Sequence, residues 1–183
     1  MKNMFFILFI LFTFLSQMTI VYCDEQTYSA NIPQAFRDAK FQVFEQPKDS
    51  EDFTLPLLNG GEVTLSEYRG MVVVLAFWTT WCTYCHEEMS SKEIFYQYFK
   101  DRGLEILAIN YKEDSNIVSQ YIDNNDYTFP VVLDLDGSVK TDYEVSGYPT
   151  CFIINREGKI IAKRVGTLNW NAPELIYAFK ALL

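Results

Sequence analysis

Two cysteines in Cys-x-x-Cys spacing lie in the segment Trp81-Cys82-Thr83-Tyr84-Cys85. An apolar run at 71–78 precedes them, and residues 83–100 have the composition of a helix. A cysteine that begins a helix faces free N–H groups and the positive end of the helix dipole, which favour its thiolate. Cys82 is therefore the predicted nucleophile. Cys85, one helical turn further on, is predicted to attack the mixed disulfide that Cys82 forms with a substrate.

Half of a zinc site and two incidental cysteines are the alternatives for this pair. A structural zinc ion needs four ligands, so two more would have to stand at suitable spacing. The chain has a single histidine, His86, and Cys151 stands far along the sequence in an apolar run, so these two do not make a second ligand pair. A buried free cysteine usually behaves as a small apolar residue. The sequence thus favours redox chemistry, with no metal and no cofactor.

The elements that must position the pair form a strand, a helix and a second strand. Residues 71–78 are apolar throughout and rich in valine, which is typical of a strand buried on both faces of a sheet. Residues 104–111 form a second such run, and the helix between them ends at Asp101-Arg102-Gly103. The pattern predicts a βαβ unit with Cys82 at the start of its helix.

The rest of the chain continues this alternation and predicts an α/β fold. Residues 53–58 and 62–65 flank the turn Asn59-Gly60-Gly61, which is a hairpin signal. The remaining expected elements are a helix at 115–125, a strand at 130–134, a short helix at 138–143, a hairpin of 150–155 with 159–163, and a closing helix at 173–182.

The first 23 residues are typical of an export signal, because Lys2 is followed by an apolar run at 4–15. Val21-Tyr22-Cys23 resembles a cleavage site, and cleavage after it is the favoured interpretation. An uncleaved membrane anchor is an alternative, since the apolar stretch approaches the length needed to span a bilayer. Lipid attachment at Cys23 is another, although bulky Tyr22 stands where a small residue is expected.

Beyond this segment, residues 24–50 are expected to form a connector or an edge element, and residues 51–183 one domain. A short helix is expected around 33–41. The whole chain has a formal net charge of −9, and because residues 1–23 hold one lysine and no acid, 14 basic minus 24 acidic residues leave −10 for the remainder. Without a basic stripe, this charge disfavours nucleic acid as a partner. Membrane contact is expected only through residues 1–23.

Four motifs together indicate a family. They are Asp52-Phe53-Thr54-Leu55, Ala76-Phe77-Trp78 running into the cysteine pair, the helix and strand at 115–134, and Gly147-Tyr148-Pro149-Thr150. On these motifs, which cover about 51–183, the chain resembles the thioredoxin superfamily, and within it the TlpA/ResA-like exported thiol-disulfide oxidoreductases related to cytochrome c maturation factors. The resemblance implies a thioredoxin fold: a central mixed β-sheet flanked by helices, with an N-terminal β-hairpin and an inserted helix and strand.

The resemblance also implies a substrate-binding surface beside the cysteines. Pro149 would be the cis-proline that faces them, and the backbone of Tyr148 would pair with an extended substrate segment as an added strand does. Gly147 and Pro149, just before an apolar run, independently indicate a special turn. Trp81, directly before Cys82, would present an apolar face to substrate proteins. An ordinary trans proline in a loop is the alternative.

Glu88 is the predicted acid of the site. It lies three residues after Cys85, and therefore on the same face of the helix. Many thioredoxins carry an aspartate on the central strand where this chain has Ala76, and the resembled subfamily uses a glutamate in the place of Glu88. A partly buried glutamate there can relay protons to and from Cys85. The alternative is a surface ion pair between Glu88 and Lys92.

The implied activity is thiol-disulfide exchange, with reduction of disulfides in exported proteins, apocytochrome c among them, as the favoured direction. The implied partners are these substrates and a membrane or periplasmic thiol-disulfide electron donor. The implied location is the periplasm or the extracytoplasmic face of the membrane, or outside the cell if the signal is cleaved. Tyr84 stands where proline is common in this family, and because the residues between the cysteines influence the reduction potential, the direction stays open.

Two other functions stay open. A thiol peroxidase is one, because the fold and the opening hairpin also occur in peroxiredoxins and Thr79 lies three residues before Cys82. The closely paired Cys85 and the two neighbouring tryptophans disfavour this interpretation. The other is a non-catalytic binding module that grips extended partners through the groove at Pro149 and keeps its disulfide for stability.

Overall fold

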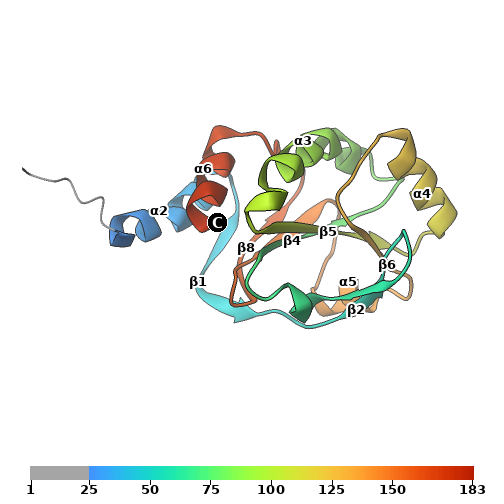
Figure 1. Cartoon of the computed structure of the whole chain (residues 1–183), viewed down its shortest axis with the longest axis horizontal. Coiled ribbons are helices and arrows are strands. Elements are labelled where there is room, and N and C mark those ends of the chain that lie inside the picture. Colours follow the sequence, from blue (N-terminus) through green and yellow to red (C-terminus); the bar gives the residue numbers. More distant parts are fainter. Residues whose placement is uncertain (1–24) are drawn as a thin grey trace, which may run out of the picture.

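A six-stranded mixed β-sheet forms the centre of the molecule, with helices on both faces (Figure 1). The computed structural model describes residues 25–183, with side chains from residue 32 onward. The predicted export segment at 1–23, with Cys23, lies outside the described residues. Within 25–183, no helix is both long enough and apolar enough to cross a membrane.

The strands of this sheet follow the order β1-β8-β7-β4-β5-β6. β4, β5 and β6 are parallel to one another, whereas each of the pairs β4–β7, β7–β8 and β8–β1 is antiparallel. The bounds are Gln42–Asp49 for β1, Val72–Trp78 for β4, Leu104–Tyr111 for β5, Val131–Asp134 for β6, Thr150–Ile154 for β7 and Lys159–Val165 for β8; β2 (Thr54–Pro56) and β3 (Glu62–Thr64) form a separate hairpin.

Helices α3, α4 and α6 lie on one face of the sheet, and α5 lies on the other face with the β2–β3 hairpin (Figure 1). Helix α2 packs against α6 at the end of the molecule where the described chain begins. The bounds are Glu25–Asp38 for α2, Thr83–Phe99 for α3, Ser115–Asn124 for α4, Ser138–Asp142 for α5 and Pro173–Leu182 for α6; the short 3-10 helices are η1 (Leu65–Tyr68) and η2 (Lys100–Arg102).

Strand β4 explains why the sheet has two hydrophobic cores. Side chains alternate between the two faces of a strand, and all seven of its residues are buried. The prediction of a central strand buried on both faces is therefore confirmed. Val72, Val74, Ala76 and Trp78 join the core that also contains side chains of α3 and α6, while Val73, Leu75 and Phe77 join the core that contains side chains of the β2–β3 hairpin and α5.

The α/β thioredoxin-like fold predicted from the sequence is confirmed, with the hairpin and the inserted helix and strand in their expected places. Gly103 follows α3 and η2 with a φ of 94°, in the left-handed region that favours glycine, which ends the helix as expected. In the segment 24–50, the bounds of the elements differ from those expected from the sequence. Its helix, α2, begins earlier than expected and contains Pro33, and its second half is strand β1, which extends the main sheet by pairing with β8.

Candidate active site

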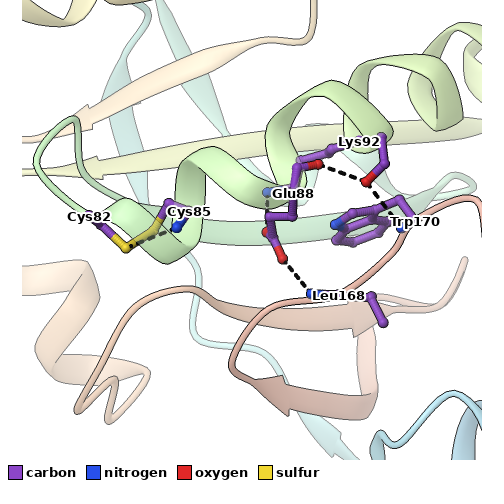
Figure 2. A network of polar contacts seen from close by, with 7 residues as sticks. Cys82, Cys85, Glu88, Lys92, Leu168 and Trp170 are labelled. Atoms are coloured by element: carbon purple, nitrogen blue, oxygen red, sulfur yellow. Dashed lines mark hydrogen bonds and ion pairs between the residues drawn. A yellow bond between two sulfur atoms is a disulfide. The ribbon is translucent and has the colours of Figure 1, made fainter.

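Cys82 and Cys85 form a disulfide at the N-terminus of α3. Strand β4 ends at Trp78, and the short turn 79–81 leads the chain from the centre of the sheet into the helix. Cys82 is the N-cap residue of α3, and its Sγ accepts a hydrogen bond from the Cys85 backbone N–H at 3.2 Å (Figure 2). Free N–H groups and the helix dipole at this position stabilise negative charge on the sulfur after the disulfide is reduced.

The two cysteines differ in exposure. Cys82 is 7% exposed, whereas Cys85 is completely buried. Thiol-disulfide exchange requires that the attacking thiolate reach the sulfur it attacks. A partner molecule therefore reaches Cys82, while the protein itself shields Cys85.

A groove of about 460 Å³ opens beside Cys82, lined by residues 81–84 and 146–148. Trp81 and Tyr84 are largely exposed at its edge, at 66% and 64%. The Tyr148-Pro149 peptide bond is cis, as the family resemblance implied, and the Tyr148 ring meets the Trp81 ring edge to face with centroids 5.9 Å apart. The cysteine, the indole and the turn at Tyr148 thus share one surface.

Glu88 is buried, and its carboxylate is engaged on both oxygens. Oε1 lies 2.7 Å from the Lys92 ammonium, and Oε2 accepts the backbone N–H of Leu168 at 3.0 Å. The ion pair with Lys92 that was considered on a helix surface does exist, but both side chains lie inside the protein. Glu88 follows Cys85 by one turn of α3 (Figure 2).

Cys151 lies on β7, where its backbone is paired with Ala76 of the central strand. It is a free thiol and it is buried. Burial raises the pKa of this thiol strongly, and the negative charge of Glu88 raises it further. Cys151 therefore stays protonated at neutral pH and does not compete with Cys82 as a nucleophile.

The turn before Cys82 is held by a residue that the sequence analysis did not single out. Glu113 accepts hydrogen bonds from the backbone N–H of Thr80 at 2.7 Å, from the Thr80 hydroxyl, and from the Asn110 side-chain amide at 2.7 Å. On the other side, the Thr80 carbonyl is 2.7 Å from His86 Nε2, which donates because a carbonyl oxygen can only accept. The His86 ring stacks on Tyr121 of α4. These contacts attach the turn to β5, α3 and α4.

Replacing Glu113 by glutamine is expected to loosen this turn. The carboxamide has one acceptor oxygen in place of two and carries no charge, and hydrogen bonds to charged groups contribute about 1.5–3 kcal/mol. We expect a loss of about that size in the free energy of unfolding, with faster hydrogen exchange at the Thr80 amide. The neighbouring carboxylate provides a control: Asp114 is the N-cap residue of α4, where asparagine serves as well, so Asp114→Asn should leave both quantities unchanged. Equal protection of Thr80 in Glu113→Gln and the unaltered protein would contradict this account.

Comparisons with known proteins agree with this geometry. The family model described as AhpC/TSA matches residues 48–163. The thiol-disulfide oxidoreductase ResA of Bacillus subtilis is 40% identical over 127 residues, which are 69% of this chain and 71% of the relative. The crystal structure of a proposed DsbE thiol:disulfide interchange protein from Chlorobium tepidum superposes with a TM-score of 0.69 at 28% identity, covering 76% of this chain and 99% of that one. The crystal structure of StoA from Bacillus subtilis superposes with a TM-score of 0.61 at 25% identity, covering 70% of this chain and 97% of that one.

The family match begins at the end of β1 and ends within β8, so it includes the β2–β3 hairpin, the cysteine pair, the inserted helix and strand, and the cis-proline turn. With the 40% identity to ResA over 127 residues, the chain belongs to the AhpC/TSA family and is, within the thioredoxin-like proteins, a thiol-disulfide oxidoreductase of the ResA-like group.

Proposed function

We propose that the protein reduces disulfides in exported proteins. The observation that carries the proposal is the redox pair at the start of α3, with the accessible Cys82 at the edge of an aromatic groove. Similarity to ResA supports the class of reaction. Apocytochrome c, whose haem-attachment sequence is itself a Cys-x-x-Cys-His motif, is the substrate that we place first.

In the proposed reaction, the Cys82 thiolate of the reduced protein attacks one sulfur of the substrate disulfide. A bond forms between Cys82 and that sulfur, the substrate disulfide breaks, and the other substrate sulfur leaves as a thiolate that takes a proton from solvent. Cys85 then attacks Cys82, so the Cys82–Cys85 disulfide forms and the second substrate thiol is released. The substrate gains two electrons, and the protein pair loses two.

We assign Glu88 to the proton that Cys85 loses in the second step. Cys85 is completely buried, so its proton needs an internal acceptor on its way out, and Glu88 is the carboxylate one turn away on the same helix. A carboxylate held by two hydrogen-bonding partners is also fixed in orientation. Glu88 is therefore the proposed proton relay of the site.

We assign substrate binding to the groove at Trp81, Tyr148 and Pro149. An extended segment of a substrate protein can pair with the backbone at Tyr148, as an added strand does, while Trp81 covers its apolar side chains. Burial raises the pKa of the Tyr148 hydroxyl, so the phenol stays neutral in the groove. A neutral aromatic surface suits apolar segments around a disulfide.

We further propose that the site operates outside the cytoplasm, because residues 1–23 have the pattern of an export signal or anchor. An oxidising compartment would return the pair to its disulfide, so continued reduction requires a thiol-disulfide electron donor in or near the membrane.

The reduction potential of the full chain against glutathione tests the direction of the reaction. We expect a value closer to about −270 mV, at the reducing end of this fold, than to about −120 mV, at the oxidising end. A second assay follows reduction of an oxidised Cys-x-x-Cys-His peptide, with oxidised glutathione as the control disulfide, and we expect the peptide to react faster. A potential near −120 mV would contradict the proposed direction, and equal rates for the two disulfides would contradict the proposed substrate preference.

A further inference from the structure

Lys92 is a charged side chain in an unusual place for a lysine. It lies on α3 one turn after Glu88, and its side chain is only 1% exposed. Lysine is rarely buried unless it is paired, because removing an ammonium from water costs a great deal of free energy. Its ion-pair partner is Glu88, at 2.7 Å.

The pair is enclosed by the loop that follows β8. Figure 2 shows the Glu88 carboxylate directed to the backbone of Leu168, whose N–H donates to Oε2 at 3.0 Å. The indole of Trp170, from the same loop, lies 5.4 Å from the Lys92 ammonium. Ser91 joins the loop to the helix, because its Oγ donates to the Glu88 backbone carbonyl at 2.9 Å and accepts the backbone N–H of Trp170 at 3.2 Å. The loop thereby excludes water from the ion pair.

The ionisable groups around the pair come from three elements. Cys85 precedes it on α3, Cys151 faces it from β7, and Arg164 lies nearby on β8. Cys151 interacts electrostatically with Glu88, Lys92 and Arg164, and burial keeps its thiol protonated. Arg164 is directed elsewhere, because its guanidinium donates to the carbonyl oxygens of Lys40 and Thr167. Lys92 is therefore the cation in direct contact with the Glu88 carboxylate.

We propose that Lys92 is a positioning residue for the exchange reaction: its ammonium keeps Glu88 ionised and oriented, ready to accept the proton of Cys85. This inference rests on the proposed role of Glu88. When Cys85 attacks Cys82, the bond between Cys82 and the substrate sulfur breaks, the Cys82–Cys85 bond forms, and the Cys85 proton passes to Glu88. Glu88 then returns the proton to solvent or to the departing substrate thiolate.

The charge of Lys92 sets the pH range in which this transfer works. Without the ammonium, a buried carboxylate has no counter-ion, and burial disfavours its charged form. Glu88 would then hold its proton to higher pH and could not accept the one from Cys85. Because the ion pair of 2.7 Å would be lost, we expect Lys92→Met to move the lower limb of the pH profile of the resolving step to higher pH. At higher pH the rate should recover.

The test is a single-turnover experiment on the reduced full chain in detergent, between pH 5 and 9. Reduced protein is mixed with an oxidised Cys-x-x-Cys-His peptide, quenched with acid, and analysed by mass spectrometry, which separates the mixed disulfide from the released peptide. The variants are Lys92→Met, Lys92→Arg, Glu88→Gln and the double variant Glu88→Gln/Lys92→Met. Lys92→Arg keeps the charge and should retain the pH profile of the unaltered protein.

The double variant decides whether Lys92 acts through Glu88. Glu88→Gln alone should slow the attack of Cys85 on the mixed disulfide and remove the lower limb of its pH profile. Adding Lys92→Met to Glu88→Gln should change neither the rate nor the shape of that profile. If Lys92→Met slows resolution equally at every pH, the residue has a packing role only and the inference is wrong. If Glu88→Gln resolves as fast as the unaltered protein, the proposed role of Glu88 fails as well, whereas a slow Glu88→Gln with an unshifted Lys92→Met overturns the inference about Lys92 alone.

A measurement that needs no change at Lys92 guards against a variant that does not fold. Infrared difference spectra between the unaltered protein and Glu88→Gln report whether the Glu88 side chain is a carboxylate or a protonated acid. We expect a carboxylate band at neutral pH. A protonated acid at neutral pH would overturn the inference whatever the behaviour of the lysine variants.

Discussion

Cys82→Ser is expected to abolish disulfide reduction, and Cys85→Ser to leave the protein covalently joined to its substrates. Cys82 is the accessible member of the pair, so without its thiolate the first bond cannot form. Losing the attacking group of a covalent mechanism should lower the rate by a factor on the order of 10³ or more. In Cys85→Ser the first step proceeds, but the mixed disulfide has no internal thiol to resolve it. Non-reducing electrophoresis with mass spectrometry measures the adducts.

The double variant Cys82→Ser/Cys85→Ser is the matched control, because it retains the buried Cys151. It should form no adducts through residues of the domain. Adducts at Cys151 would show that this thiol reacts despite its burial, and full activity in Cys82→Ser would support the non-catalytic binding module. Peroxide consumption that survives in Cys85→Ser but not in Cys82→Ser would favour the thiol peroxidase.

Phe179→Ala is expected to cause the largest loss of stability among single changes outside the site. The Phe179 ring is completely buried where three helices meet, and it contacts Phe36 of α2 and Phe95 and Phe99 of α3. Removing a buried phenylalanine side chain leaves a cavity and costs about 3–5 kcal/mol. Urea unfolding followed by tryptophan fluorescence measures the free energy of unfolding.

Tyr177 provides a control on the same helix, because its side chain is 45% exposed. Tyr177→Ala should change the free energy of unfolding by about 0.5 kcal/mol or less. A cost below about 1 kcal/mol for Phe179→Ala would contradict this prediction, because it would mean that the three helices move together and close the cavity.

The cysteine pair and the central strands could be predicted because their signals are local. A Cys-x-x-Cys motif after an apolar run places Cys82 at the start of a helix whatever happens elsewhere in the chain. The same is true of Gly103, whose backbone conformation ends the helix. The family resemblance supplied Pro149 and the cis bond, which spacing alone does not determine.

The surroundings of Glu88 could not be predicted because they depend on contacts between distant segments. Spacing placed Glu88 and Lys92 on one helical face, and that alone is equally compatible with an exposed ion pair. The pair is buried because the loop with Leu168 and Trp170 covers it, about eighty residues later in the chain. No periodic pattern marks such a loop, so the burial of Lys92 emerges only from the fold.

The contact between Glu113 and the turn at Thr80 could have been predicted from the sequence. Parallel strands end at the same edge of a sheet, so the residues after β5 lie beside the turn that follows β4. The polar residues Asn110 and Glu113 at that place were candidates for contact with Thr80. In contrast, the extent of α2 was hard to predict, because Pro33 lies inside it and proline is best tolerated in a first turn.

Strand β1 also determines how well the protein resists aggregation. By pairing with β8 it covers a strand whose free N–H and C=O groups could otherwise template pairing with a second molecule. β1 itself contains charged residues and Pro47, which discourage such pairing. At the opposite margin, Leu58 of the hairpin loop donates to Val131 of β6. A chain shortened to start at residue 51 would keep its redox pair, but it would expose the edge of β8 and remove Phe36 from the packing around Phe179. Both its solubility and its stability should therefore fall.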